Sequence, residues 1–193
     1  MAKTDPEAMK RDRKKNIQWV VTIFVTTILI SGTISLVSDE VMAGSSVAVA
    51  FVILLAIIIL GILFDIIGMA VATADEKPFH SMASRKIPGA QESIRLLRNA
   101  ERVSSICNDV VGDICGVVSG SASATIAALI LTNADVTWPK GVSLAMSALV
   151  AGLTVGGKAI GKTIAVKSCT KIVHLVGRVI HGWNRFAKKK KLR

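Results

Sequence analysis

Long uninterrupted apolar segments dominate the first third of the chain. Residues 17–37 form 21 consecutive positions without a charged side chain, and residues 45–64 form another 20. A helix needs roughly 20 apolar residues to cross the hydrocarbon core of a bilayer. Strands that span a membrane alternate polar with apolar residues, and these segments do not. The pattern therefore predicts two transmembrane helices, at about 17–38 and 45–72.

Two further apolar segments are interrupted by charges. Residues 101–131 include two aspartates and residues 141–166 include two lysines. Each segment is long enough to span, and ionisable side chains within such helices usually face the interior of the bundle. We therefore expect an all-α membrane protein with about four transmembrane helices, which form one domain over residues 17–166. A hydrophobic content of 51% argues against four core helices of a water-soluble domain.

The distribution of lysine and arginine predicts the topology. Residues 1–16, 73–102 and 166–193 hold six, six and nine of these residues, whereas the connections 38–44 and 132–140 hold one. Alternating crossings put the three basic segments on one face, and the positive-inside rule makes that face cytoplasmic. We expect a multi-pass protein of the cell (plasma) membrane with both termini cytoplasmic. The net charge of +11 flanks membrane spans, so nucleic acid is not an expected partner.

The connections have their own predicted features. Residues 1–16 are expected to be a basic cytoplasmic tail, and Asp39 and Glu40 a short acidic outer turn. Residues 73–100 form a cytoplasmic helical segment that Pro78 and the Pro88-Gly89 pair divide into two short pieces, because Pro-Gly marks a turn.

The C-terminal segment, residues 167–193, has the clearest periodicity in the chain. Apolar side chains recur at steps of four and three residues: Ile172, Val176, Val179, Trp183 and Phe186. A basic row recurs on the opposite helix face: Lys167, Lys171, Arg178, Arg185 and Lys188, with His174 and His181 in the same row. This pattern predicts an amphipathic interfacial helix that binds the anionic lipids of the inner leaflet. A metal-binding role for the histidines is not expected.

Ionisable residues at membrane depth are the candidate functional residues, because their burial is costly. They are Asp65, Asp109, Asp113, Lys158 and Lys162. Asp109 and Asp113 are four residues apart and share one face of a regular helix. Converging carboxylates suit Mg²⁺, which prefers oxygen ligands. The alternative is that the lysines neutralise the aspartates and no ion is bound, and the sequence leaves both open.

Glycine spacing forms a second constellation. Several glycine pairs have the G-xxx-G spacing, among them Gly112 and Gly116, Gly152 and Gly156, and Gly157 and Gly161. Small residues at this spacing let helices approach closely, within or between protomers. The sequence has no phosphate-binding loop, no Ser/His/Asp arrangement and no HExxH motif, so we do not expect an enzyme.

Residues 64–165 resemble the transmembrane domain of the cyclin M/CorC family of magnesium transporters. The likeness lies in three stretches: residues 89–102, which lead straight into a helix; the polar start of that helix at 104–109; and the segment 157–165. The order of a span, a cytoplasmic helical pair, two spans and an amphipathic helix is also similar. In this view the helix at 17–38 is an added span, and the paired nucleotide-binding domains that often follow in the family are absent.

The resemblance implies a homodimer that moves or senses Mg²⁺, with ligands from the three shared spans. Carried over by position, Asp65 falls near the family's first-span serine, whereas Lys158 replaces its glutamate. The leading expectation is thus divalent-cation transport or binding, with Asp65, Asp109 and Asp113 as ligands or coupling groups and Lys158 and Lys162 as internal counter-charges. The alternative is a non-transporting membrane scaffold or regulator that kept the fold and lost the ion site.

Overall fold

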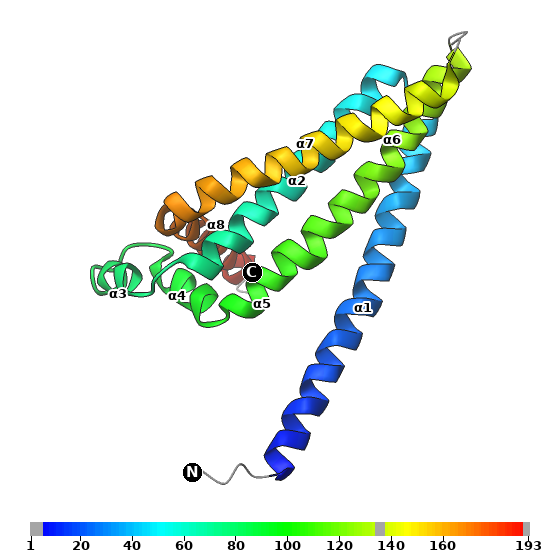
Figure 1. Ribbon diagram of the computed structural model, residues 1–193. Coiled ribbons are helices and arrows are strands. Elements are labelled where there is room, and N and C mark those ends of the chain that lie inside the picture. The colour runs from blue at the N-terminus through cyan, green and yellow to red at the C-terminus, as the bar shows by residue number, and fades with distance from the viewer. Residues whose placement is uncertain (1–5, 134–137, 191–193) are drawn as a thin grey trace.

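The fold consists of helices throughout the described part of the chain. The computed structural model describes residues 6–133 and 138–190, and the side chains at 6–16, 43, 133 and 186–190 lie outside that description. Four long spans lie side by side in Figure 1: α1 (Pro6–Ala43), α2 (Val47–Thr73), the composite span α5 (Ala100–Ser105), η1 (Ile106–Gly112) and α6 (Asp113–Asn133), and α7 (Pro139–Lys167). Each has a segment long and apolar enough to cross a membrane. The predicted all-α membrane fold with four spans is confirmed.

The outer surface of the bundle is apolar. Phe24 on α1, Val52 on α2 and Val155 on α7 expose 64%, 68% and 68% of their surface. Soluble monomers rarely expose continuous apolar surface of this extent. Lipid chains satisfy it without cost, so the exposure pattern agrees with a multi-pass membrane protein.

Helix α2 is the centre of the bundle and packs against both α6 and α7. Its sequence is apolar on every side, as expected of a helix enclosed by protein and lipid. Ala50, Leu54 and Ile58 of α2 are buried in a cluster with Ile126 of α6 and Val150 of α7.

Helix α1 lies at the edge of the bundle and packs chiefly against α6. Figure 1 shows it diverging from the other spans toward its N-terminus. Near the other end of α1, Asp39 Oδ1 accepts a hydrogen bond of 3.4 Å from Thr125 Oγ1 of α6. Toward the N-terminus the guanidinium of Arg102 lies 5.4 Å from the ring centre of Trp19, a cation–π distance.

The bounds of α1 differ from the expected ones. The helix starts at Pro6, inside the expected basic tail, and it continues to Ala43. Asp39 and Glu40 are therefore helical, and the expected outer turn at these residues is wrong. Proline suits the first helical position. No further proline lies within α1, and Gly44 directly follows its last residue, so the local sequence gives the helix no strong reason to stop earlier.

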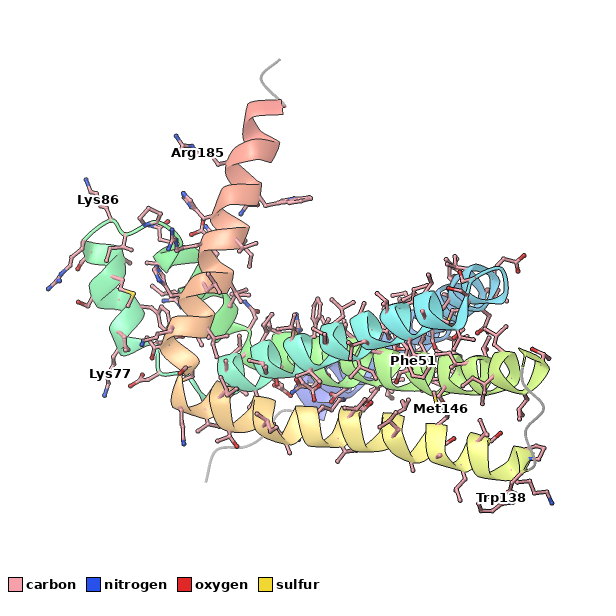
Figure 2. The ribbon with its side chains drawn as sticks, turned by 90° about the horizontal axis from the view of Figure 1, so that it is seen from above. Phe51, Lys77, Lys86, Trp138, Met146 and Arg185 are labelled. Carbon is pink, nitrogen blue, oxygen red and sulfur yellow. The ribbon has the colours of Figure 1, made fainter. Side chains whose placement is uncertain are left out.

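Three helices, called the collar below, gather at one end of the bundle: α3 (Lys77–Ser84), α4 (Ala90–Arg98) and α8 (Cys169–Lys190). Their apolar sides close a second core, in which Phe79, Leu97 and Val173 are buried with Val71 of α2 and Ala165 of α7. The expected pair of short helices within 73–100 and the expected helix after 167 are both present. Trp138 lies at the opposite end of the bundle (Figure 2).

Helices α4 and α8 meet through a glycine contact. Gly89 precedes α4 with a φ of 88°, a conformation that glycine adopts without strain. A Cβ at Gly89 would lie 2.6 Å from the backbone nitrogen of Arg178. The Ser93 hydroxyl donates a hydrogen bond of 3.1 Å to the Val173 carbonyl. Close backbone approach therefore fixes α8 on α4.

A polar contact closes the edge of the same joint. His181 Nδ1 of α8 lies 2.9 Å from Glu92 Oε1 of α4. Partial burial alone raises the pKa of the Glu92 carboxyl, but the hydrogen bond from His181 and the nearby charges of His181 and Arg95 outweigh it, and the pKa lies below the usual 4.5. A carboxyl group whose pKa is lowered by folding stabilises the fold at pH values above its ordinary pKa. This stabilisation is lost as the pH falls through the pKa of the folded state. Protonation of Glu92 therefore weakens the contact in acid, as the pH falls through a value below 4.5.

Candidate functional site

Three spans bring charged groups together inside the bundle. Lys158 Nζ of α7 lies 3.3 Å from Asp65 Oδ2 of α2 and 4.0 Å from Asp113 Oδ1 of α6. It also donates a hydrogen bond of 3.4 Å to the carbonyl oxygen of Gly112. The Asp65 side chain is only 7% exposed, whereas that of Asp113 is 71% exposed. Lys158 therefore forms a buried ion pair with Asp65 and a longer, exposed one with Asp113.

Glycines make this convergence possible. A Cβ at Gly112 would collide with the Asp65 carboxylate, and a Cβ at Gly157 or Gly161 would collide with Ile62 or Ile66 of α2. α7 can therefore approach α2 closely enough for Lys158 to reach Asp65. A Cβ at Gly116, Gly152 or Gly156 would meet nothing within 4 Å, so these three glycines do not make close contacts within the described part of the protomer.

The composite span carries a π-helical turn beside the ion pair. Residues Ile106–Gly112 form η1, between the α-helical parts α5 and α6. π-Helical turns are rare and occur frequently at functional sites. Within η1 the Asn108 amide donates to Ser104 Oγ at 3.2 Å and fills the space beside Gly68 of α2. The wider turn lies between Asp109 and Asp113, so the face-sharing rule of a regular helix does not apply to them.

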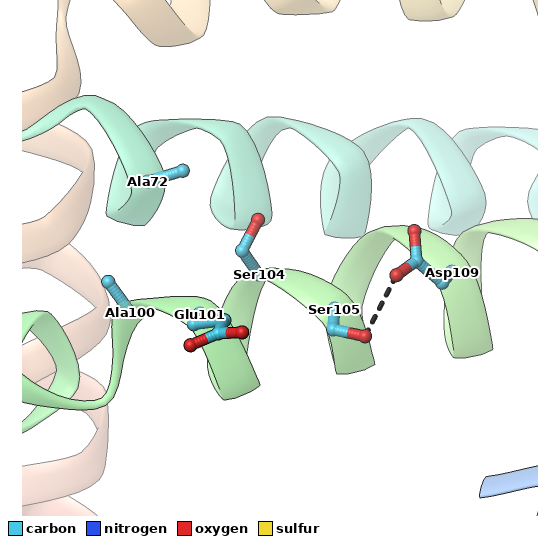
Figure 3. A pocket seen from close by; sticks show the side chains of 6 residues that line it. All are labelled: Ala72, Ala100, Glu101, Ser104, Ser105 and Asp109. Atoms are coloured by element: carbon cyan, nitrogen blue, oxygen red, sulfur yellow. Dashed lines mark hydrogen bonds between the residues drawn. The ribbon is translucent and has the colours of Figure 1, made fainter. Parts of the chain in front are cut away.

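Asp109 lies apart from Lys158 in a different environment. Its carboxylate accepts a hydrogen bond of 2.8 Å from Ser105 Oγ. Figure 3 shows both residues lining an open pocket between the end of α2 and the segment formed by α5 and the start of η1. The pocket has a volume of about 500 Å³, and its lining consists of Ala72, Ala100, Glu101, Ser104, Ser105 and Asp109.

The structure thus joins some of the predicted residues and separates others. It brings Asp65, Asp113 and Lys158 together, places Asp109 in a separate pocket, and leaves Lys162 exposed on α7. Within the described residues, no group of three His, Cys, Asp or Glu side chains is arranged to hold a metal ion. The paired charges sum to one net negative charge, since two carboxylates face one ammonium.

The predicted basic row is exposed as far as it is described, and its first member, Lys167, is the last residue of α7 rather than part of α8. Lys167, Lys171, Arg178 and Arg185 are exposed, and the side chain of Lys188 lies outside the described residues. His181 contacts Glu92 and His174 is partly buried, so the two histidines do not form a common site.

Sequence reasoning missed two contributors to the site. One is the Gly112 carbonyl, which accepts from Lys158, and the other is Asn108, whose Oδ1 is buried without a hydrogen-bond partner in the described structure. A backbone acceptor has no side-chain signal. Asn108 did have one, because an amide within an apolar span is as unusual as a charge.

No protein-family model, curated protein or solved structure matches this chain. The positions of the charged side chains in the bundle are therefore the basis for the function proposed below.

Proposed function

We propose that this protein is a non-transporting membrane scaffold or regulatory subunit. The observation that carries this proposal is the position of Lys158, whose ammonium lies 3.3 Å from the buried Asp65 carboxylate. A transported cation would need that carboxylate, and an ammonium beside it both neutralises the carboxylate and repels a second cation. The ion pair joins α7 to α2 and supports a fixed bundle, which is what a scaffold needs.

A second candidate function, divalent-cation transport or binding, has a specific observation in its favour. Asp113 is 71% exposed, and Asp109 and Glu101 share an open pocket. Carboxylates at membrane depth that remain accessible are typical of ion pathways. The resemblance to the CorC family, with Mg²⁺ as the cation and a homodimer as the assembly, belongs to this second proposal.

The two functions predict different responses to Mg²⁺. For the scaffold, we expect the melting temperature of the purified wild type in detergent to be the same with and without millimolar Mg²⁺. The variant Lys158→Glu replaces the ammonium with a carboxylate and should gain Mg²⁺-dependent stability, because three carboxylates would then converge. The measurement is a thermal unfolding series in both conditions.

The same series identifies the alternative. A wild-type melting temperature that rises with Mg²⁺, and no longer does so in Asp109→Asn or Asp113→Asn, would overturn the scaffold proposal in favour of a cation carrier. Uptake of Mg²⁺ into proteoliposomes above the level of empty vesicles would do the same. If Mg²⁺ changes the melting temperature of none of the four proteins, the ion site is excluded and the gain expected for Lys158→Glu is wrong.

We also propose that the collar and both termini are cytoplasmic, in the plasma membrane. The support is the excess of lysine and arginine in the segments that surround the collar. Ser81 is exposed on α3, so a Ser81→Cys variant in which the native cysteines are alanine offers one accessible thiol. An impermeant maleimide should label it only after the cells are permeabilised. Equal labelling of intact cells would invert the topology.

A further inference from the structure

Helix α8 has an apolar row that the protein covers at one end only. Ile172, near its start, packs into the collar core. Further along the same row, Val179 and Trp183 are 66% and 77% exposed. The basic side chains Lys171, Arg178 and Arg185 are also exposed. The distal part of α8 therefore presents an uncovered apolar row on one face and an uncovered basic row on another.

The direction of α8 relative to the bundle decides what this surface faces. The chain turns at Ser168, between α7 and α8, and Figure 2 shows α8 running across the direction of the bundle. In the same view Arg185 points away from the side on which the spans extend. Residues two apart on a helix differ by about 200°, so Trp183 faces the opposite way from Arg185, toward the level of the membrane spans.

We propose that α8 lies in the membrane surface, with Val179 and Trp183 inserted among the lipids and with the charges of Lys171, Arg178 and Arg185 attracting the helix to a surface of anionic lipid headgroups. Tryptophan is favoured at this depth, and basic residues beside it attract negative headgroups. The Gly89, Ser93 and Glu92 contacts with α8 hold the helix at this angle. The inference is independent of whether the bundle carries a cation.

The charges also favour lipid over nucleic acid as the partner. Nucleic-acid binding through phosphate contacts uses the basic side chains alone and would leave an apolar row uncovered. Here the row with Val179 and Trp183 is exposed along the same helix. An interfacial helix is the arrangement that satisfies both faces at once.

The test uses Trp183 as a depth probe in the full-length protein. In a Trp19→Phe/Trp138→Phe background, Trp183 is the single tryptophan. The protein is reconstituted into vesicles that contain phosphatidylcholine brominated near the headgroup, with or without phosphatidylglycerol. We expect strong quenching of Trp183 with phosphatidylglycerol, and quenching that decreases as salt rises.

A charge-neutral variant isolates the basic face. Each basic residue near the surface strengthens the association with an anionic membrane by about fivefold. Arg178→Gln/Arg185→Gln should therefore weaken the association of α8 with vesicles that contain phosphatidylglycerol by about 25-fold and reduce its salt dependence, since Lys171 remains. The matched control is Arg85→Gln/Lys86→Gln, at the exposed turn after α3, which should behave as the parent.

Three results would overturn the proposal. The first is Trp183 emission typical of a water-exposed tryptophan, without quenching in any vesicle. The second is quenching of the same size with and without phosphatidylglycerol, and in the Arg178→Gln/Arg185→Gln variant as in the parent. The third is a single-stranded oligonucleotide that displaces Trp183 from anionic vesicles at stoichiometric concentration, which would assign the basic face to nucleic acid.

Discussion

Replacing Lys158 with methionine is expected to lower the free energy of unfolding by about 3–5 kcal/mol, the range for removing one partner of a buried ion pair. Asp65 would be left with its carboxylate 7% exposed and without its ammonium partner. Methionine keeps most of the volume of the lysine stem, so the loss reports charge rather than a cavity. Equilibrium unfolding in detergent by urea or heat measures it.

Two further variants separate this effect from general sensitivity. Lys162→Met removes an exposed lysine one turn away and should change the free energy of unfolding by less than about 0.5 kcal/mol. Asp65→Asn/Lys158→Met removes both charges and should recover most of the loss, because an apolar or neutral replacement of a whole buried pair is often tolerated. If the loss in the double variant equals the sum of the losses in Asp65→Asn and Lys158→Met measured singly, the ion pair does not couple α2 to α7.

Substitution of Gly89 by alanine should also be strongly destabilising. A φ of 88° costs a residue with a Cβ about 1–2 kcal/mol, and the added Cβ would also lie 2.6 Å from the Arg178 nitrogen. We expect a total loss of about 3 kcal/mol, together with faster tryptic cleavage at Arg178 as α8 separates from α4.

Gly182 is the matched control for this change. It lies in α8, and a Cβ there would meet nothing within 4 Å. Gly182→Ala should therefore raise stability by about 0.5–1 kcal/mol through helix propensity and leave the cleavage at Arg178 unchanged. Loss of the same size in both variants would mean that α8 tolerates no substitution, and that the contact with Gly89 has no special role.

Much of the fold follows from local features of the sequence. The uncharged segments of about 20 residues predict spans whatever their neighbours, because the bilayer sets the required length. The tail periodicity also predicts α8. The contact of Asp39 with the Thr125 hydroxyl does not follow in this way, since the two residues are 86 positions apart. Long-range partners of this kind leave no local pattern.

The site is predictable only in its composition. Charge within apolar segments identifies Asp65, Asp113 and Lys158 as unusual, but their pairing depends on the rotation of three helices about their axes. The π-helical turn η1 alters that rotation between Asp109 and Asp113. Asn108 of this turn fits beside Gly68 of α2. The spacing of four residues could not show that the two aspartates have different environments.

The peripheral position of α1 has a consequence for biogenesis. α1 ends at Ala43, and its chief partner α6 starts 70 residues later, at Asp113. At roughly 5–20 residues per second, the ribosome needs about 4–14 s to synthesise that stretch. During that interval α1 must remain in the bilayer without its partner. The hydroxyls of Thr22, Thr26 and Thr33 donate to carbonyls of their own helix, so these polar groups need no neighbour. α1 can thus remain in lipid as an independent helix until α6 has been synthesised.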